Sequence, residues 1–151
     1  MLDLIEFVLK IYAAYVIFKI ATQVLRIVGL FKLYDKLDEA KWKGLIPIFN
    51  EYTLYKKVYN LKSFWIYIAA DFANSFINSY LQNAQDPGTI LLILGIVTSI
   101  VVFVSRIKFA KAYAKAFNKG GFFAFLAFVF PGITYVITGF SKNITYVGNN
   151  E

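Results

Sequence analysis

The sequence predicts an all-α fold, an integral membrane bundle of four transmembrane helices in a single domain over residues 1–151. Composition is the first observation behind this prediction: 59% of the residues are hydrophobic and the mean hydropathy is +0.59. Soluble domains are only about 45–50% apolar. The second observation is that the aliphatic and aromatic residues, including 16 Phe and 11 Tyr, form long runs. Helices that cross lipid need such runs.

The first predicted helix covers about residues 4–31 and contains several polar side chains. Lys19, Gln23 and Arg26 are spaced i, i+4 and i+7, so they share one face while apolar residues cover the rest. The N-terminus lacks the basic region and the small-residue cleavage site of a secretory signal. We therefore expect a retained membrane helix, and a soluble amphipathic helix is the alternative.

Three further transmembrane helices are predicted, at about residues 64–82, 89–109 and 122–140. The third is purely apolar until Arg106, and its helical pattern is expected to continue past the membrane to a stop at Gly120 and Gly121. The fourth contains Pro131, which predicts a break or kink because proline removes a backbone hydrogen bond.

The segment between the first two helices, residues 32–63, mixes charged residues with large apolar ones and is predicted to lie along the headgroup region. Within it we expect helix to continue from Lys36 to Lys43 and to be interrupted at Gly44. Pro47 then opens a second short helix that reaches Asn60, since proline is tolerated in a first turn.

Basic residues indicate the orientation in the membrane. Nearly all of those outside the spans lie in residues 32–63 and 106–121, and Lys and Arg in short loops stay on the cytoplasmic side. These two segments are therefore predicted to be cytoplasmic loops. With four spans, both termini then face outward, and the protein is expected to be a multi-pass protein of the cell (plasma) membrane.

The net charge of +7 is explained first by this topology. The lipid bilayer is the first expected partner, because lysines beside the membrane contact anionic headgroups. The lysines placed for such contacts are Lys56, Lys57, Lys108, Lys111 and Lys115. No nucleic-acid-binding module surrounds them, so nucleic acid is not an expected partner.

The second predicted helix carries a polar stripe inside an apolar span. Asp71, Asn74, Ser75 and Asn78 fall at i, i+3, i+4 and i+7 and so share one face. An unpaired carboxylate there costs about 2.5–3.5 kcal/mol on insertion scales, so this face should meet protein or water. We expect it to pack on the Lys19–Gln23–Arg26 face of the first helix, with Asp71 paired to a basic residue. Such a cluster acts either as interhelical glue or as a polar path for an ion or small solute.

The residue types present exclude most hydrolase mechanisms. The chain has no Cys and no His, which removes disulfides, Cys or His metal sites, thiol nucleophiles and imidazole bases. Ser63 beside Lys62 and Ser141 beside Lys142 lack the setting of a Ser–Lys catalytic pair. We therefore predict no catalytic site, no metal and no cofactor.

Two stretches carry a resemblance. Residues 42–50 read W-x-x-LIP-x-x-N and residues 114–120 read AKAF-x-KG. They resemble motifs of an uncharacterised family of small bacterial multi-helix membrane proteins, sometimes labelled as signal peptidases. The sequence departs from the usual pattern at Phe49, where a tyrosine is usual, and at Asn118, where a glycine is usual. The resemblance implies roles for the motif positions in shaping an interfacial turn, with one of them capping a helix; these are Trp42, Pro47 and, as the cap, Asn50.

These observations predict a non-enzymatic membrane protein that acts through protein and lipid contacts, as an accessory subunit or an immunity-type protein. A protein partner or a homo-oligomer is expected. The alternative is a small oligomeric channel or transporter subunit in which Asp71, Asn74 and Asn78 line a path.

Overall fold

The computed structural model describes residues 2–84 and 88–148, and within them all regular structure is helical. The predicted all-α fold is confirmed. A long helix, α1 (Leu2–Lys36), comes first. The later elements are a short 3-10 helix η1 (Lys41–Leu45) and the α-helices α2 (Pro47–Val58), α3 (Leu61–Asn83), α4 (Thr89–Ala116), α5 (Gly121–Val129) and α6 (Pro131–Phe140).

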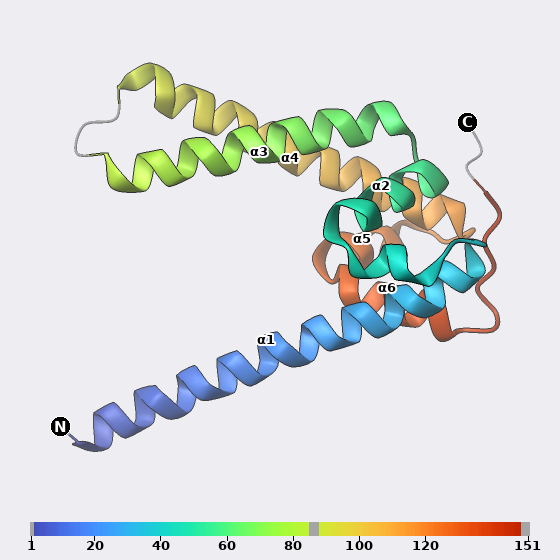
Figure 1. Cartoon of the computed structure of the whole chain (residues 1–151), viewed down its shortest axis with the longest axis horizontal. Helices are drawn as coiled ribbons and strands as arrows, with labels where there is room; N and C mark the ends of the chain where they lie inside the picture. The colour runs from blue at the N-terminus through green and yellow to red at the C-terminus, as the bar shows by residue number, and fades with distance from the viewer. Residues whose placement is uncertain (1, 85–87, 149–151) are drawn as a thin grey trace.

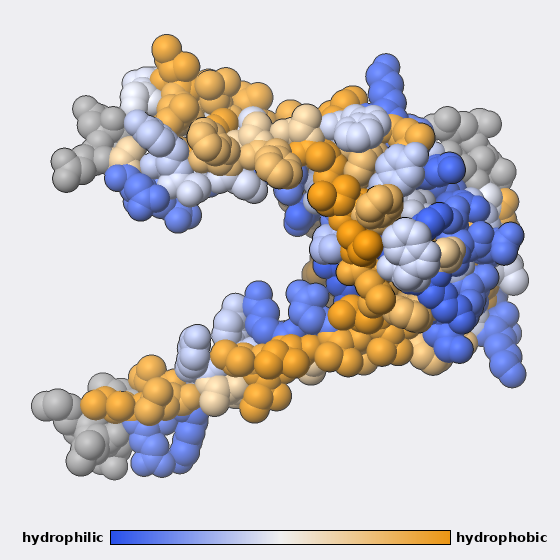
Figure 2. Space-filling view, in the orientation of Figure 1, coloured by the Kyte–Doolittle hydropathy of each residue, from blue (hydrophilic) through white to orange (hydrophobic). Residues whose placement is uncertain are grey.

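The molecule has two arms that extend from one compact end (Figure 1). One arm is the N-terminal part of α1, and the other is the antiparallel hairpin of α3 and α4. We call the compact end the body; it contains the C-terminal part of α1, η1, α2, the C-terminal part of α4, α5, α6 and the tail 141–148. An open gap separates the two arms (Figure 2). The buried core lies mainly in the body, around Tyr34, Val58, Tyr113 and Phe117.

Glycines allow α6 to lie directly against the backbone of α1. A Cβ atom at Gly139 would come within 2.8 Å of the Gly29 carbonyl oxygen and of the Lys32 Cβ. A Cβ atom at Gly29 would come within 2.6 Å of the Val136 backbone nitrogen. Small residues permit this close approach of helices, which gains van der Waals contact along both backbones.

The fourth predicted helix, residues 122–140, is two short helices of opposite direction. Phe128 of α5 contacts Phe103 and Phe123 contacts Tyr113, so α5 runs antiparallel to α4. In contrast, Gly132 and Gly139 of α6 lie against successive turns of α1, so α6 runs parallel to α1. The expected break at Pro131 is confirmed, and it reverses the chain because Phe130 leaves helical geometry (φ −129°, ψ 62°). Neither helix, at about 14–15 Å, reaches across a bilayer core of about 30 Å.

Left-handed residues, and not the glycines of the sequence prediction, end the two long helices. Asp38 (φ 53°) follows α1 and Asn118 (φ 51°) follows α4. The Lys119 N–H donates to the Ala114 carbonyl and the Asn118 N–H to the Lys115 carbonyl, which is a Schellman ending. The predicted stop at Gly120 is therefore wrong by two residues. Asn118 stands where the resembled family usually has glycine, and both residues tolerate this conformation.

The segment between α1 and α3 differs in one part from the prediction. Helix does not continue to Lys43, because α1 ends at Lys36, and Gly44 lies inside η1. Pro47 does open a short helix, as expected, and that helix ends at Val58.

Lys36 holds the C-terminal tail on the end of α1. Its Nζ donates to the carbonyls of Thr138 (2.6 Å), Ile144 (2.7 Å) and Ser141. Tyr146 donates its hydroxyl to the Lys57 carbonyl. The tail thus lies at the opposite end of α1 from Leu2, and 35 residues of helix separate the two by about 50 Å.

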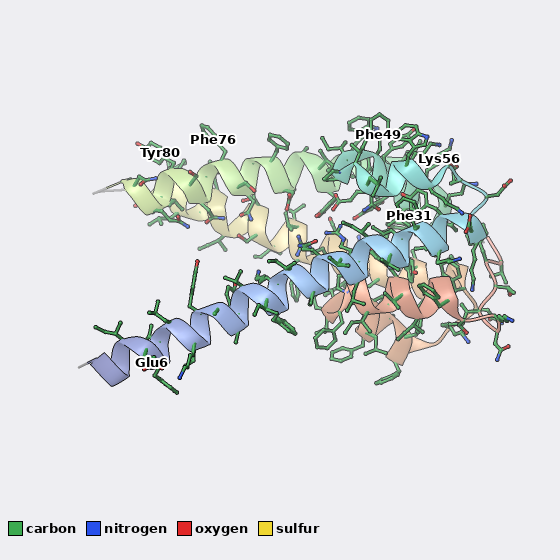
Figure 3. All side chains as sticks on the ribbon, turned by 60° about the horizontal axis from the view of Figure 1, so that its bottom comes forward. Glu6, Phe31, Phe49, Lys56, Phe76 and Tyr80 are labelled. Atoms are coloured by element: carbon green, nitrogen blue, oxygen red, sulfur yellow. The ribbon has the colours of Figure 1, made fainter. Side chains whose placement is uncertain are left out.

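Two helices are long and apolar enough to cross a membrane, the Ile5–Lys36 part of α1 and the whole of α4. Most of their surface is exposed, which distinguishes them from the core helices of a soluble domain. In the hairpin arm, Phe76 and Tyr80 of α3 point outward from the helix (Figure 3), and the Phe76 side chain is 76% exposed. The arms therefore present apolar surface that the chain itself does not cover.

The contact of α1 with α6 predicts a strong effect of one added methyl group. Gly139→Ala should lower the free energy of unfolding by about 1–3 kcal/mol, because the new Cβ overlaps the α1 backbone. Gly120→Ala is the control, since no atom lies within 4 Å of the Cβ it would add. Chemical unfolding of both variants in mixed micelles measures the difference, and equal stabilities would contradict the packing described for Gly139.

Candidate functional site

A cavity of about 260 Å³ lies where the two arms meet the body. Side chains from α1, α2, α3, α4, α5 and α6 line it, so it forms only when the whole fold is assembled. Its polar lining consists of two arginines, one glutamate and three tyrosines: Arg26, Arg106, Glu51, Tyr55, Tyr67 and Tyr135.

Helix α2 places an acid and an aromatic ring at one wall of this cavity. Glu51 and Tyr55 are four residues apart and therefore share a face of α2. The Tyr34 hydroxyl donates to the Asn50 carbonyl (3.0 Å), which ties α2 to α1. The Tyr55 ring stacks on Phe109, with 4.5 Å between ring centroids, and on Tyr67, with 5.7 Å. These contacts hold Glu51 in place without bonding its carboxyl group.

The charged groups of the cavity are close enough to influence one another, but among the described residues they form no ion pair. Burial raises the pKa of the Glu51 carboxyl; Arg26 and Arg106 oppose this rise and Asp71 adds to it. Arg106 donates one long hydrogen bond, 3.5 Å, to the Tyr67 hydroxyl. The Arg26 Nε is buried and has no hydrogen-bond partner in the described part of the chain.

The polar side chains of the cavity can bind a charged or polar group. Arginines offer fork-shaped donors for phosphate or carboxylate groups, Glu51 accepts from cations, and tyrosine hydroxyls do both. The described residues contain no group of three or more Asp or Glu that could hold a metal ion.

The comparison with protein families gives one match. A family model covers residues 42–149, which is more than half of the chain. The chain belongs to the family of unknown function DUF5684. This agrees with the resemblance to an uncharacterised family. No curated protein and no solved structure matches the chain. Five of the six polar cavity residues lie within the matched range 42–149, in α2, α3, α4 and α6. The sixth, Arg26, precedes that range.

The DUF5684 match begins at Trp42, and the structure assigns the first motif to η1 and α2. The Trp42 ring packs against Phe49, with 5.9 Å between centroids, and Pro47 is the first residue of α2 as expected. The expected cap is wrong: Asn50 lies buried inside α2 and receives the Tyr34 hydroxyl. The capping asparagine is Asn60, whose side chain accepts from the Ser63 N–H at the start of α3 (2.8 Å).

The two predicted polar faces do not pack on each other. In the described residues α1 contacts α6 and η1, while α3 contacts α4 and α2. Lys19 and Gln23 are exposed on the arm, and only Arg26 reaches the cavity. Asp71 is half-buried near Arg106 and Glu51 and makes no ion pair with Lys19 or Arg26 in this part of the chain. The open gap between the arms is the physical reason (Figure 2).

Asn74 instead joins α3 to α4. Its amide oxygen accepts from the hydroxyls of Ser99 (2.8 Å) and Thr98 (3.2 Å) and from the Asn78 amide (3.0 Å). Two of the four predicted stripe residues, Asn74 and Asn78, therefore stabilise the hairpin. Gly95 assists by letting Ile77 and Leu81 pack closely on α4.

The predicted headgroup lysines lie on the body. Lys56, Lys108, Lys111 and Lys115 are exposed there, and Figure 3 shows Lys56 with Phe49 on α2. Lys57 is partly buried and lies 3.4 Å from Glu39, an acid whose pKa is lowered mainly by its hydrogen bond from Lys43. Whether these lysines contact lipid stays a prediction.

Sequence reasoning missed Glu51, Arg106 and the three cavity tyrosines. Glu51 and Tyr55 carry a weak signal, an acid and an aromatic ring on one face of a helix rich in apolar residues. Arg106 also has one, because it ends the most apolar run of the chain. Nothing in the sequence indicates that these residues meet one another.

The hairpin network predicts that Asn74 is needed for stability. Asn74→Val should reduce the free energy of unfolding by about 1–2 kcal/mol, because up to three interhelical or local hydrogen bonds are lost at about 0.6 kcal/mol each. Ser75→Ala, at an exposed neighbouring position, should change it little. Chemical unfolding in mixed micelles compares the two, and a neutral Asn74 variant would remove the glue interpretation.

Proposed function

We propose that this protein is a multi-pass integral membrane protein that acts through protein and lipid contacts, as an accessory subunit or an immunity-type protein, and not as an enzyme. The observation that supports this most directly is the α1 arm. Large apolar side chains are exposed all along it, while Lys19 and Gln23 are exposed in its middle. An isolated arm of this kind needs lipid around it and a polar neighbour beside it.

In this proposal α1, α3 and α4 cross the membrane. Helix α3 has 23 residues, about 34 Å, which matches the bilayer core. The body then lies at one membrane surface, where α5 and α6 enter the lipid and return. Backbone that turns inside the membrane is tolerated where protein surrounds it, and α1 and α4 flank this helix pair.

Charge supports a cytoplasmic body. Most of the basic residues lie at this end of the molecule, where Figure 2 has its largest hydrophilic surface. Because α5 and α6 do not add a span, the C-terminal tail shares the cytoplasmic side with the body, and the N-terminus lies outside. This proposal differs from the sequence-based prediction that both termini face outward.

Single cysteines test this topology directly, since the chain has none of its own. Asn143→Cys in the tail should react with a membrane-impermeant maleimide only after cells are permeabilised. Gln82→Cys, near the tip of the hairpin, should react in intact cells. Labelling of both positions in intact cells would instead support four spans with both termini outside.

The polar neighbour of α1 is proposed to be a membrane segment of another protein. Gln23 hydrogen-bonds across helices when a partner helix is present, and a lysine in a span costs about 2.5–3.5 kcal/mol when it has no such support. Figure 2 shows hydrophilic side chains of α1 on the side that borders the gap, which makes the gap the natural position of the partner.

The hairpin network favours this proposal over the conducting alternative. A polar path needs side chains that are free to bind a passing ion or solute. The Asn74 oxygen already accepts three hydrogen bonds, and Asn78 donates one of them. The stripe of α3 is therefore better suited to holding the hairpin together.

Photo-crosslinking tests the partner. A photoreactive phenylalanine analogue replacing Gln23 should give one protein adduct of defined mass in native membranes, because Gln23 shares a face of α1 with Arg26, which lines the cavity where the arms meet the body. The same analogue at Ala21, two residues away and on the opposite face of α1, is the matched control and should not give that adduct. An adduct of twice the chain mass would support the oligomeric alternative, and equal adducts from both positions would contradict a specific partner.

A further inference from the structure

Several polar groups that line the cavity have no partner within the described protein. Arg26 makes no hydrogen bond or ion pair there, and neither do the Glu51 carboxyl and the hydroxyls of Tyr55 and Tyr135. Buried polar groups are normally bonded to protein, water or ligand. A cavity of about 260 Å³ has room for a small polar group, although not for a drug-sized molecule. The cavity thus has the donors and acceptors of a binding site.

The charges indicate what kind of group fits. Arg26 and Arg106 contribute two positive charges to the wall, and Glu51 contributes a negative one. Asp71 lies close enough to influence both Glu51 and Arg106, so the local charge is balanced. A simple anion would meet Glu51 unfavourably and a simple cation would meet the arginines unfavourably. A group that carries both a negative and a positive charge can interact favourably with the arginines and with Glu51.

The depth of the cavity in the membrane placement proposed above further limits the class of ligand. Arg106 lies 17 residues after Thr89 (106 minus 89), about 26 Å along α4 from the tip of the hairpin. The bilayer core is about 30 Å thick. Arg106 and the cavity therefore lie at the cytoplasmic edge of the lipid, at the level of the headgroup phosphates. The gap extends from the body toward the free ends of the arms (Figure 2), which lie in the bilayer in this placement.

We propose that this cavity binds the headgroup of a phospholipid that carries both a phosphate and a primary ammonium group, as phosphatidylethanolamine does. The phosphate contacts the guanidinium groups of Arg26 and Arg106, which provide charge-assisted, paired hydrogen bonds. The ammonium contacts Glu51 and lies against the tyrosine rings, whose faces attract cations. The acyl chains leave through the gap. This inference rests on the proposed membrane placement and does not require a protein partner.

Native mass spectrometry of the purified full chain tests the proposal. The protein is mixed in detergent with equal amounts of phosphatidylethanolamine and phosphatidylglycerol of the same acyl chains. We expect the first lipid to be retained about tenfold more than the second, because Glu51 distinguishes them by one charged hydrogen bond. Arg106→Gln should reduce binding of both lipids about tenfold. Glu51→Gln should abolish the preference while phosphate binding remains.

The controls separate a site from general lipid adhesion. Lys111→Gln removes an exposed basic residue of α4 outside the cavity and should leave the preference unchanged. Arg106→Lys retains the charge and should retain part of the binding, and circular dichroism of each variant establishes that it is folded. Soluble glycerophosphoethanolamine competes with the lipid if the headgroup alone is recognised, and failure to compete identifies the lipid chains as part of the ligand.

Three results would overturn the proposal. They are equal retention of the two lipids by the wild type, an unchanged preference in folded Glu51→Gln, and equal loss of binding in the Lys111→Gln control. If one of these results is obtained while the labelling test shows a cytoplasmic tail and Gln23 gives its adduct, the lipid proposal is wrong and the proposed function is still supported. A tail that reacts in intact cells would instead remove the membrane placement on which both proposals depend.

Discussion

The direct contact of the α1 and α6 backbones is the constraint on which the rest of the structure depends. Gly29 and Gly139 leave no room for side chains between the two helices, so α6 has one position along α1. That position places Tyr135 opposite Arg26 at the cavity and brings the tail to Lys36. It also requires the reversal at Pro131, because α5 has already followed α4 in the other direction. In the proposed membrane placement, this reversal puts the tail on the same side of the membrane as the body.

Periodicity in the sequence predicts the faces of helices but not what each face meets. The spacing of Lys19, Gln23 and Arg26 puts them on one face of α1, yet only Arg26 reaches the cavity. The Asn74 stripe likewise contacts protein as expected, although that protein is α4 and not α1. Polar groups in an apolar helix form hydrogen bonds with the nearest available donors. In a hairpin these donors lie on the neighbouring helix, here α4, and not on the more distant α1. The polar faces of helices are therefore predictable from the sequence, and the pairing of those faces is not.

Single residues likewise predict local breaks in a helix but not the direction of the chain that follows. Pro131 predicts a break by itself, because its missing N–H is a property of one residue. The direction of the next helix instead depends on the contact of Gly139 with Gly29, which is distant in the sequence. The cavity is the extreme case. Its polar residues come from five different helices, and each has an ordinary structural reading in its own segment. Only the assembled fold brings Glu51 between two arginines, so no pattern along the chain could indicate the site.

The spacing within the cavity argues that it is kept open for a purpose. A partly buried acid near two arginines is stabilised by closing onto one of them, and an unpaired buried polar group costs about 1–3 kcal/mol. Glu51 does not close, because the Tyr34 bond to Asn50 and the stacking of Tyr55 on Phe109 hold α2 at a distance. A fold selected for stability alone would relax these contacts and form the ion pair. The proposed headgroup, which carries both signs of charge, would join the separated groups.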